Sequence, residues 1–235
     1  MRNHYPVIIA TIPLLFAVQS PLNATAPQPL IGQSAQWRVI SVPNRKPTKF
    51  AITPAGEMRV RSDMSVAFFV RRLQREQHGK IRGGAPNISW RWRVDGTVTP
   101  TDLANRGGDD RPVAIHLFFG QQPQHTSLFA KLFGSFPPHG HALTYVWGGK
   151  RPIGSIIDNP YFDKGKIIIV RNAQDKVGRW RAETRNLADD LRRAFGTPHK
   201  LGPLTHIAIS GDTDDTGSRN SARVAKLQIT RRQHQ

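Results

Sequence analysis

The feature that most restricts the fold is a strict alternation of apolar and polar residues over 87–95, NISWRWRVD. Successive side chains of a β-strand point to opposite faces, so Trp90 and Trp92 would share one face with an isoleucine and a valine. Arg91 and Arg93 would share the other face. A helical pattern would repeat every three to four residues instead. We therefore expect a strand whose tryptophan face packs into a hydrophobic core.

Similar short segments recur along the chain. Runs rich in valine, isoleucine and aromatic residues are bounded by glycine, proline, asparagine or aspartate, which is typical of strands joined by turns. The segment 111–119 is almost entirely apolar and predicts a central strand. The expected strands cover 37–42, 57–61, 65–73, 87–95, 111–119, 142–147, 166–170, 178–184, 204–210 and 222–229.

A helix is expected over 186–195. Asn186 can cap its first turn, Leu187 and Leu191 share one face, and Gly196 follows the last turn. Many short strands with a single helix predict a mainly β fold rather than alternating strands and helices. We expect an antiparallel β-sandwich or jelly roll with one short helix near 186–195.

The chain begins with the features of an export signal. Arg2 precedes an uncharged apolar stretch over 7–18, and small residues follow at 24–26. This order is typical of a secretory signal peptide. The stretch is shorter than the roughly 20 residues of a membrane-spanning helix, although a retained N-terminal anchor is the alternative. We expect 1–26 to be removed, leaving no transmembrane segment, and the protein to be periplasmic or extracellular.

The remaining sequence predicts one domain. We expect an irregular lead-in over 27–36, a single β-sandwich domain over 37–230 and a tail over 231–235. A chain of 235 residues can bury a core without cross-links. The chain has no cysteine, which excludes disulfides and thiolate chemistry.

The composition is strongly basic. Lysine and arginine number 34 against 16 aspartates and glutamates, which gives a formal net charge of +18. Such a surface attracts anionic partners. Export would keep the chain away from nucleic acid, so the expected partner is a glycan or another anionic envelope polymer. The composition does not determine the oligomeric state.

Five residues form the candidate metal site. Asp212, Asp214 and Thr216 alternate after an apolar strand, as in the start of a calcium loop. The twelfth position from Asp212 is an arginine, which excludes an EF-hand. Asp109 and Asp110 precede the central strand and would approach this segment if the two strands are close. Calcium is thus a candidate cofactor, and a plain turn stabilised by aspartate side chains is the alternative.

The same aspartates allow an enzymatic interpretation. Two carboxylates about 5 to 10 Å apart in an open groove can hydrolyse a glycosidic bond. Asp109 or Asp110 would act with Asp212 and Asp214, together with Glu183. No catalytic residue is assigned by the sequence itself.

Arginine and aromatic residues are the candidates for ligand binding. Arg91 and Arg93 would point outward and begin an anion-binding stripe. Tyr145 and Trp147 share one face of their expected strand, and Trp180 lies beside a glycine. Exposed aromatic rings of this kind would stack on sugars, whereas buried ones would belong to the core.

Several motifs together resemble one bacterial family. They are ISWRWRV at 88–94, GDD at 108–110, LTYVW at 143–147, WRAETRN at 180–186, FG at 195–196 and SGDTDDT at 210–216. In order and spacing they resemble domain-of-unknown-function family 3047, over roughly 37–230. The resemblance implies an exported, β-rich protein and no particular reaction. The family pattern has asparagine where Asp215 stands here, which adds a negative charge to the acidic segment.

Three functions follow as hypotheses. The first is a non-catalytic envelope protein that binds a glycan or another anionic surface polymer. The second is a carbohydrate-active hydrolase or lyase that uses the aspartate cluster. The third is a structural domain held by a calcium clip.

Overall fold

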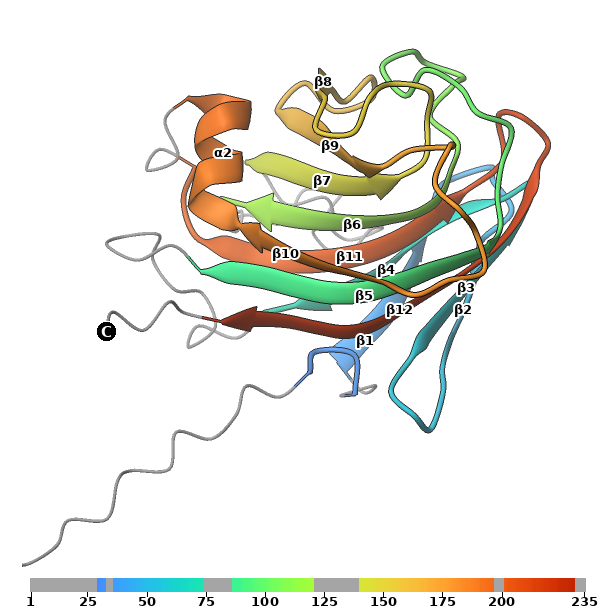
Figure 1. Cartoon of the computed structure of the whole chain (residues 1–235), viewed down its shortest axis with the longest axis horizontal. Coiled ribbons are helices and arrows are strands. Elements are labelled where there is room, and N and C mark those ends of the chain that lie inside the picture. The colour runs from blue at the N-terminus through green and yellow to red at the C-terminus, as the bar shows by residue number, and fades with distance from the viewer. Residues whose placement is uncertain (1–28, 33–35, 74–85, 121–139, 197–200, 231–235) are drawn as a thin grey trace, which may run out of the picture.

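A computed structural model describes residues 29–32, 36–73, 86–120, 140–196 and 201–230. These residues form two facing β-sheets with one described helix (Figure 1). The mainly β sandwich expected from the sequence is therefore confirmed. The expected export signal at 1–26 and the tail at 231–235 lie outside the described residues.

The larger sheet has seven strands in the order β1-β4-β11-β6-β7-β9-β8. All neighbours in this sheet run antiparallel except β7 and β9, which are parallel. Its strands are β1 (Trp37–Ser41), β4 (Val66–Arg72), β6 (Arg111–Phe119), β7 (His141–Trp147), β8 (Ile156–Asp158), β9 (Gly165–Arg171) and β11 (Leu204–Asp212).

The smaller sheet has five strands in the order β10-β5-β12-β3-β2, all antiparallel to their neighbours. Its strands are β2 (Lys49–Ile52), β3 (Met58–Asp63), β5 (Asn87–Gly96), β10 (Arg181–Asn186) and β12 (Arg219–Thr230). Strands β2 and β8 were not expected from the sequence, because runs of four and three residues are too short to show an alternation.

The core lies between the sheets. Trp90 and Trp92 on β5 are 1% and 0% exposed, which confirms the predicted face of that strand. Tyr145 and Trp147 reach the same core from β7. Ring centroids lie 5.2 Å apart for Trp90 and Tyr145, and 5.6 Å apart for Trp92 and Trp147. Aromatic pairs at these separations stabilise a core beyond the area that they bury.

The described helix, α2 (Leu187–Phe195), closes one end of the sandwich (Figure 1). The side-chain oxygen of Asn186 accepts hydrogen bonds from the backbone N–H groups of Ala188 and Asp189, which confirms the predicted cap. Asp190 on α2 accepts a hydrogen bond from the Tyr145 hydroxyl at 2.9 Å. No helix within the described residues has the length and apolarity to cross a bilayer.

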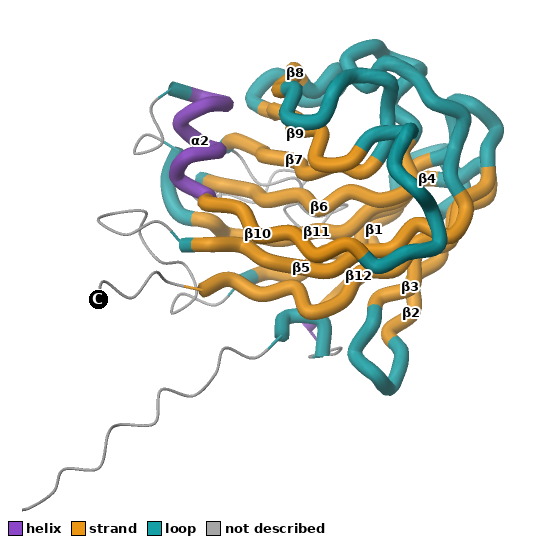
Figure 2. The backbone as a smooth tube through the Cα atoms, in the orientation of Figure 1, coloured by secondary structure: helices purple, strands orange, loops and turns teal. Residues whose placement is uncertain are grey.

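Several of the described loops gather at the end of the sandwich away from α2 (Figure 2). Strand β6 begins at that end and the neighbouring antiparallel strand β11 finishes there (Figure 1). Register pairs Arg111, the first residue of β6, with Asp212, the last residue of β11. The topology thereby brings together the two acidic segments of the sequence.

Core packing gives a first prediction. Leu143 is 0% exposed, so Leu143→Ala removes buried methyl groups and leaves a cavity. We expect the free energy of unfolding to fall by about 2 to 5 kcal/mol, measured by urea denaturation. Val39→Ala is the control, because Val39 is 49% exposed and its loss should change stability by no more than about 0.5 kcal/mol. Equal effects of the two substitutions would contradict the assignment of the core.

Candidate functional site

A cavity of about 330 Å³ lies on the outer face of the seven-stranded sheet. Phe118 and His116 on β6 line it, and they alternate with Ile115 and Leu117, which face the core between the sheets. Every residue of β6 is therefore buried: one face packs in the core between the sheets, and the other forms the floor of the cavity. This strand carries the burial pattern of a central strand, as the sequence predicted.

Aspartates gather at one end of this cavity. Asp109, Asp212, Asp214 and Asp215 all line it, from the segment before β6 and from the end of β11 with the turn that follows. The register of the two strands explains the meeting, since Asp212 pairs with Arg111.

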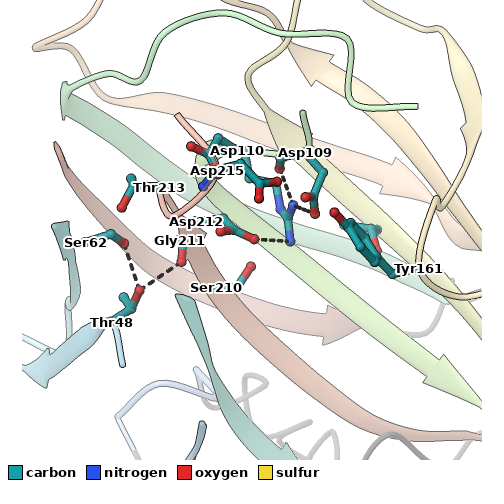
Figure 3. A network of polar contacts seen from close by, with 12 residues as sticks. Thr48, Ser62, Asp109, Asp110, Tyr161, Ser210, Gly211, Asp212, Thr213 and Asp215 are labelled. Atoms are coloured by element: carbon teal, nitrogen blue, oxygen red, sulfur yellow. Dashed lines mark hydrogen bonds and ion pairs between the residues drawn. The ribbon is translucent and has the colours of Figure 1, made fainter. Parts of the chain in front are cut away.

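The buried arginine Arg111 is the centre of this acidic end. Its Nη1 lies 2.8 Å from Asp109 Oδ2, and its Nη2 lies 3.4 Å from Asp212 Oδ2 (Figure 3). Only 6% of the Arg111 side chain is exposed. Burial disfavours the charged guanidinium, but Asp212 and Asp109 outweigh it and raise the pKa of Arg111. The guanidinium therefore stays charged and holds both carboxylates.

Asp110 points away from Asp109 and organises the turn after β11. Its carboxylate accepts hydrogen bonds from the backbone N–H groups of Asp215 at 3.2 Å and Thr216 at 2.8 Å. The Thr216 hydroxyl donates a third hydrogen bond to it at 2.5 Å. Asp110 thus fixes the position of the whole acidic turn.

Three carboxylates approach one another closely. One oxygen each from Asp110, Asp212 and Asp214 lie within 4.8 Å of one another. Burial raises the pKa of Asp212 well above its ordinary value, Arg111 opposes this, and Asp214 adds to it. Burial also raises the pKa of Asp215 to about 6, with a further contribution from Asp109. Burial and the neighbouring carboxylates thus oppose the ionisation of Asp212 and Asp215.

A network of hydroxyl groups joins this end to the smaller sheet (Figure 3). The Thr48 hydroxyl donates to the Gly211 carbonyl at 3.0 Å and lies 2.9 Å from the Ser62 hydroxyl. At Gly211 the sheets are close: an added Cβ would lie 2.7 Å from a Val60 methyl and 2.8 Å from the Ser62 hydroxyl. Only glycine fits this position without a shift of its neighbours.

A buried histidine forms part of the cavity wall. His116 Nε2 lies 2.8 Å from the Ser210 hydroxyl, and its Nδ1 lies 3.0 Å from the Thr144 hydroxyl. Burial, with the charge of Arg111, lowers the pKa of His116 well below its ordinary value. The imidazole is therefore neutral near pH 7, and it exchanges hydrogen bonds with two hydroxyl groups.

The residues expected to bind a ligand are divided between two places. Tyr145 and Trp147 are 0% and 2% exposed in the core, so the expectation that they contact a ligand is corrected: they pack between the sheets. Arg91 stacks on Trp180, with 5.3 Å between the guanidinium carbon and the ring centroid, at the outer face of the smaller sheet. Arg93, also on β5, lies 2.5 Å from Asp95. These residues do not line the cavity that holds the aspartates.

The five residues of the expected metal site are also only partly brought together. Asp110, Asp212 and Asp214 are brought together, whereas Asp109 is bound to Arg111, and the Thr216 hydroxyl donates to Asp110. Glu183, which the hydrolase hypothesis added, accepts hydrogen bonds from Arg171 at 2.8 Å and from the Trp92 indole at 3.0 Å. It does not line the cavity of the aspartates.

Several site residues were missed by the sequence analysis. Arg45 lies in a loop and its Nη1 reaches Asp214 at 3.1 Å. Tyr161 and Phe162 line the cavity from the loop between β8 and β9, and Phe68 lines it from β4. None of these belongs to a motif. A signal for Arg111 does exist, because an arginine at the start of an apolar strand needs a buried partner.

The sequence profile described as "Protein of unknown function (DUF3047)" matches residues 35–228. The chain belongs to this family. A search of curated proteins found no significant match.

Solved structures with related folds share little sequence with the chain. The xyloglucanase domain of NopAA, a type three effector from Sinorhizobium fredii, in complex with cellobiose, is 9% identical, with a TM-score of 0.46 over 83% of this chain and 93% of that chain. Endoglucanase cel12A from Rhodothermus marinus is 11% identical, with a TM-score of 0.48 over 87% and 95%. Endoglucanase 3 from Trichoderma harzianum is 12% identical, with a TM-score of 0.39 over 84% and 99%. These identities are too low to transfer an activity to the chain.

The buried arginine gives a second prediction. Arg111→Met keeps much of the side-chain volume but leaves Asp109 and Asp212 without their cation. We expect a loss of about 3 to 5 kcal/mol in the free energy of unfolding near neutral pH, measured by urea denaturation. Arg219→Met is the matched control, because that arginine is 77% exposed in its pair with Asp63 and should contribute less than about 1 kcal/mol. A loss at Arg111 no larger than that at Arg219 would contradict its central role.

The neutral histidine gives a third prediction. Because the folded pKa of His116 lies below its unfolded value, the unfolded chain binds more protons between those two values. The contribution of His116 to stability should therefore fall as the pH drops below about 6.5, the ordinary histidine value. His116→Gln, which can still donate and accept a hydrogen bond, should flatten this dependence. Midpoints of urea denaturation across that range would show it, and an unchanged slope in the variant would contradict the assignment.

Proposed function

We propose that the cavity on the seven-stranded sheet binds a glycan. The proposal rests on one observation: aromatic side chains and a cluster of carboxylates line the same cavity of about 330 Å³. Phe68, Phe118 and Phe162 supply the apolar side, and Asp214 and Asp215 supply acceptors at the acidic end. Binding sites for small ligands commonly combine an apolar lining with a few fixed polar groups.

The chemistry of a sugar fits both sides of this cavity. Its C–H faces pack against aromatic rings, and its hydroxyl groups donate to carboxylates. Hydrogen bonds to charged acceptors are about twice as strong as those between neutral groups. Tyr161 lines the cavity with 53% of its surface exposed. The Arg106 guanidinium carbon lies 5.5 Å from the centroid over one face of its ring, so the opposite face is the one proposed for such packing.

Charge favours a neutral glycan over an anionic polymer in this cavity. Four aspartates line it against the two arginines Arg45 and Arg111, and Arg111 is already committed to Asp109 and Asp212. An anionic ligand would face uncompensated carboxylates. The net charge of +18 resides elsewhere on the chain, including Arg91 beside Trp180. An anionic envelope polymer would bind that outer face of the smaller sheet instead.

Hydrolysis of the bound glycan is the second candidate. Asp214 and Asp215 both line the acidic end of the cavity, where a pair of carboxylates would be needed, and Asp214 is paired there only with the half-exposed Arg45. Asp109 and Asp212 are less suitable, because Arg111 holds both. The signal-like sequence over 1–26 would place either activity in the envelope or outside the cell.

The binding proposal gives a fourth prediction. The purified chain should be retarded in gels that contain a neutral polysaccharide, with cellulose derivatives, xyloglucan and mixed-linkage glucan as probes. Tyr161→Ala should weaken this binding about tenfold, which corresponds to about 1.4 kcal/mol. The retardation should change little with added salt, because a neutral ligand offers no charges to screen.

Trp180→Ala is the matched control for the position of the site. It removes an aromatic ring from the outer face of the smaller sheet and leaves the cavity intact. Loss of binding in Trp180→Ala but not in Tyr161→Ala would contradict the proposal. Salt-sensitive retardation by alginate or lipopolysaccharide alone would favour an anionic polymer. Release of reducing ends by the parent chain, absent in Asp215→Asn, would establish hydrolysis.

A further inference from the structure

The three closest carboxylates are spaced as ligands of one cation. One oxygen each from Asp110, Asp212 and Asp214 lie within 4.8 Å of one another. Calcium binds oxygen at 2.3 to 2.6 Å, so two oxygens on opposite sides of one ion are about 5 Å apart. The three oxygens can therefore contact a single ion without movement of the backbone. They come from the segment before β6, from the end of β11 and from the turn after it.

A second observation concerns one atom of Asp212. This carboxylate is only 6% exposed, and its Oδ2 is directed to Arg111. Its other oxygen, Oδ1, is buried and has no hydrogen-bond partner in the described part of the chain. A buried carboxylate oxygen without a partner is costly, since it has lost its hydration and gained nothing. A bound cation would satisfy this atom.

The local charge balance points the same way. Asp109, Asp110, Asp212, Asp214 and Asp215 meet two arginines, so three negative charges would be left over at the acidic end if all five carboxyl groups were ionised. Arg111 and Arg45 are already directed to Asp109, Asp212 and Asp214. Like charges this close cannot all remain ionised unless a cation or protons offset them.

The existing hydrogen bonds of Asp110 leave room for an ion. Its two oxygens accept three hydrogen bonds, from the N–H groups of Asp215 and Thr216 and from the Thr216 hydroxyl. An ionised carboxylate offers about four acceptor sites, so one direction stays open. Those same bonds hold Asp110 in place, as partners in an outer shell commonly do around metal ligands.

We propose that Asp110, Asp212 and Asp214 bind a divalent cation of the calcium class at the acidic end of the cavity. All three donors are carboxylates, which favour hard cations such as calcium over softer transition metals. Asp212 and Asp214 line the cavity, so water can complete the coordination. The ion would join the start of β6, the end of β11 and the following turn, and it does not depend on the proposed glycan.

Thermal unfolding provides the fifth prediction. The purified chain is stripped with EDTA, dialysed and melted with calcium chloride, with magnesium chloride, or with sodium chloride at equal ionic strength. A ligand that binds only the folded state raises the midpoint. At free calcium about a hundredfold above its dissociation constant, the midpoint should rise by about 5 to 10 °C for a chain of this size. Calorimetric titration should give one calcium per chain.

Substitutions assign the effect to the three aspartates. Asp212→Asn and Asp214→Asn should each reduce calcium affinity at least tenfold and abolish most of the rise in midpoint. Asp63→Asn is the matched control, because Asp63 is an exposed aspartate that pairs with Lys46 and Arg219. It should retain the full calcium response. If Asp212→Asn does not fold, Asp214→Asn and the titration of the parent chain decide the question.

Three outcomes would overturn the proposal. The first is an unchanged midpoint and no heat of binding with calcium. The second is a calcium response that survives in both Asp212→Asn and Asp214→Asn. The third is a midpoint that rises as the pH is lowered while calcium adds nothing, which would mean that protons offset the surplus charge. None of these measurements uses a glycan, so they are separate from the binding test of the cavity.

Discussion

The arrangement of the acidic end depends on one buried cation, the guanidinium of Arg111. It lies between Asp109 and Asp212, and 6% of the side chain is exposed. Removing a charge from water costs several kcal/mol, so a buried arginine persists only with close anionic partners. Topology fixes one of those partners, since Arg111 and Asp212 are register neighbours on β6 and β11, and Asp109 lies two residues before Arg111 in the chain. The strand pairing thus brings the carboxylate of Asp212 to the arginine. The guanidinium offsets only part of the free energy that burying these carboxylates costs.

The same strands build both the core and the cavity. On β6, Ile115 and Leu117 face the other sheet, while His116 and Phe118 face the cavity. A strand that is buried on both faces cannot place ionised groups along its length without large desolvation costs. Charged groups are therefore confined to the strand ends, where Asp109 and Asp212 lie. This division explains why the wall of the cavity is apolar and why its polar chemistry is concentrated at one end.

Sequence reasoning predicted what depends on local pattern. The alternation in β5 identified its core face, and Asn186 was identified as the helix cap. It also placed the aspartates at strand ends, because turn residues are recognisable. The sequence could not determine which aromatic rings are exposed. An aromatic residue on one face of a strand can contact a ligand or pack in the core, and Tyr145 packs in the core. Tyr161 reaches the cavity from a loop without periodicity, so its position depends on tertiary contacts.

The strongly basic composition is compatible with an acidic cavity end, because interactions between charges weaken with distance. Exposed charges separated by more than about 8 to 10 Å are largely screened at physiological ionic strength. The net charge of +18 therefore offsets the buried carboxylates far less than a contacting ion would. Arg45 contributes through direct contact with Asp214, but its side chain is 52% exposed and it competes with water. Only a group within bonding distance of Asp212 Oδ1 can satisfy that buried atom, and the surface arginines of the opposite sheet cannot supply it.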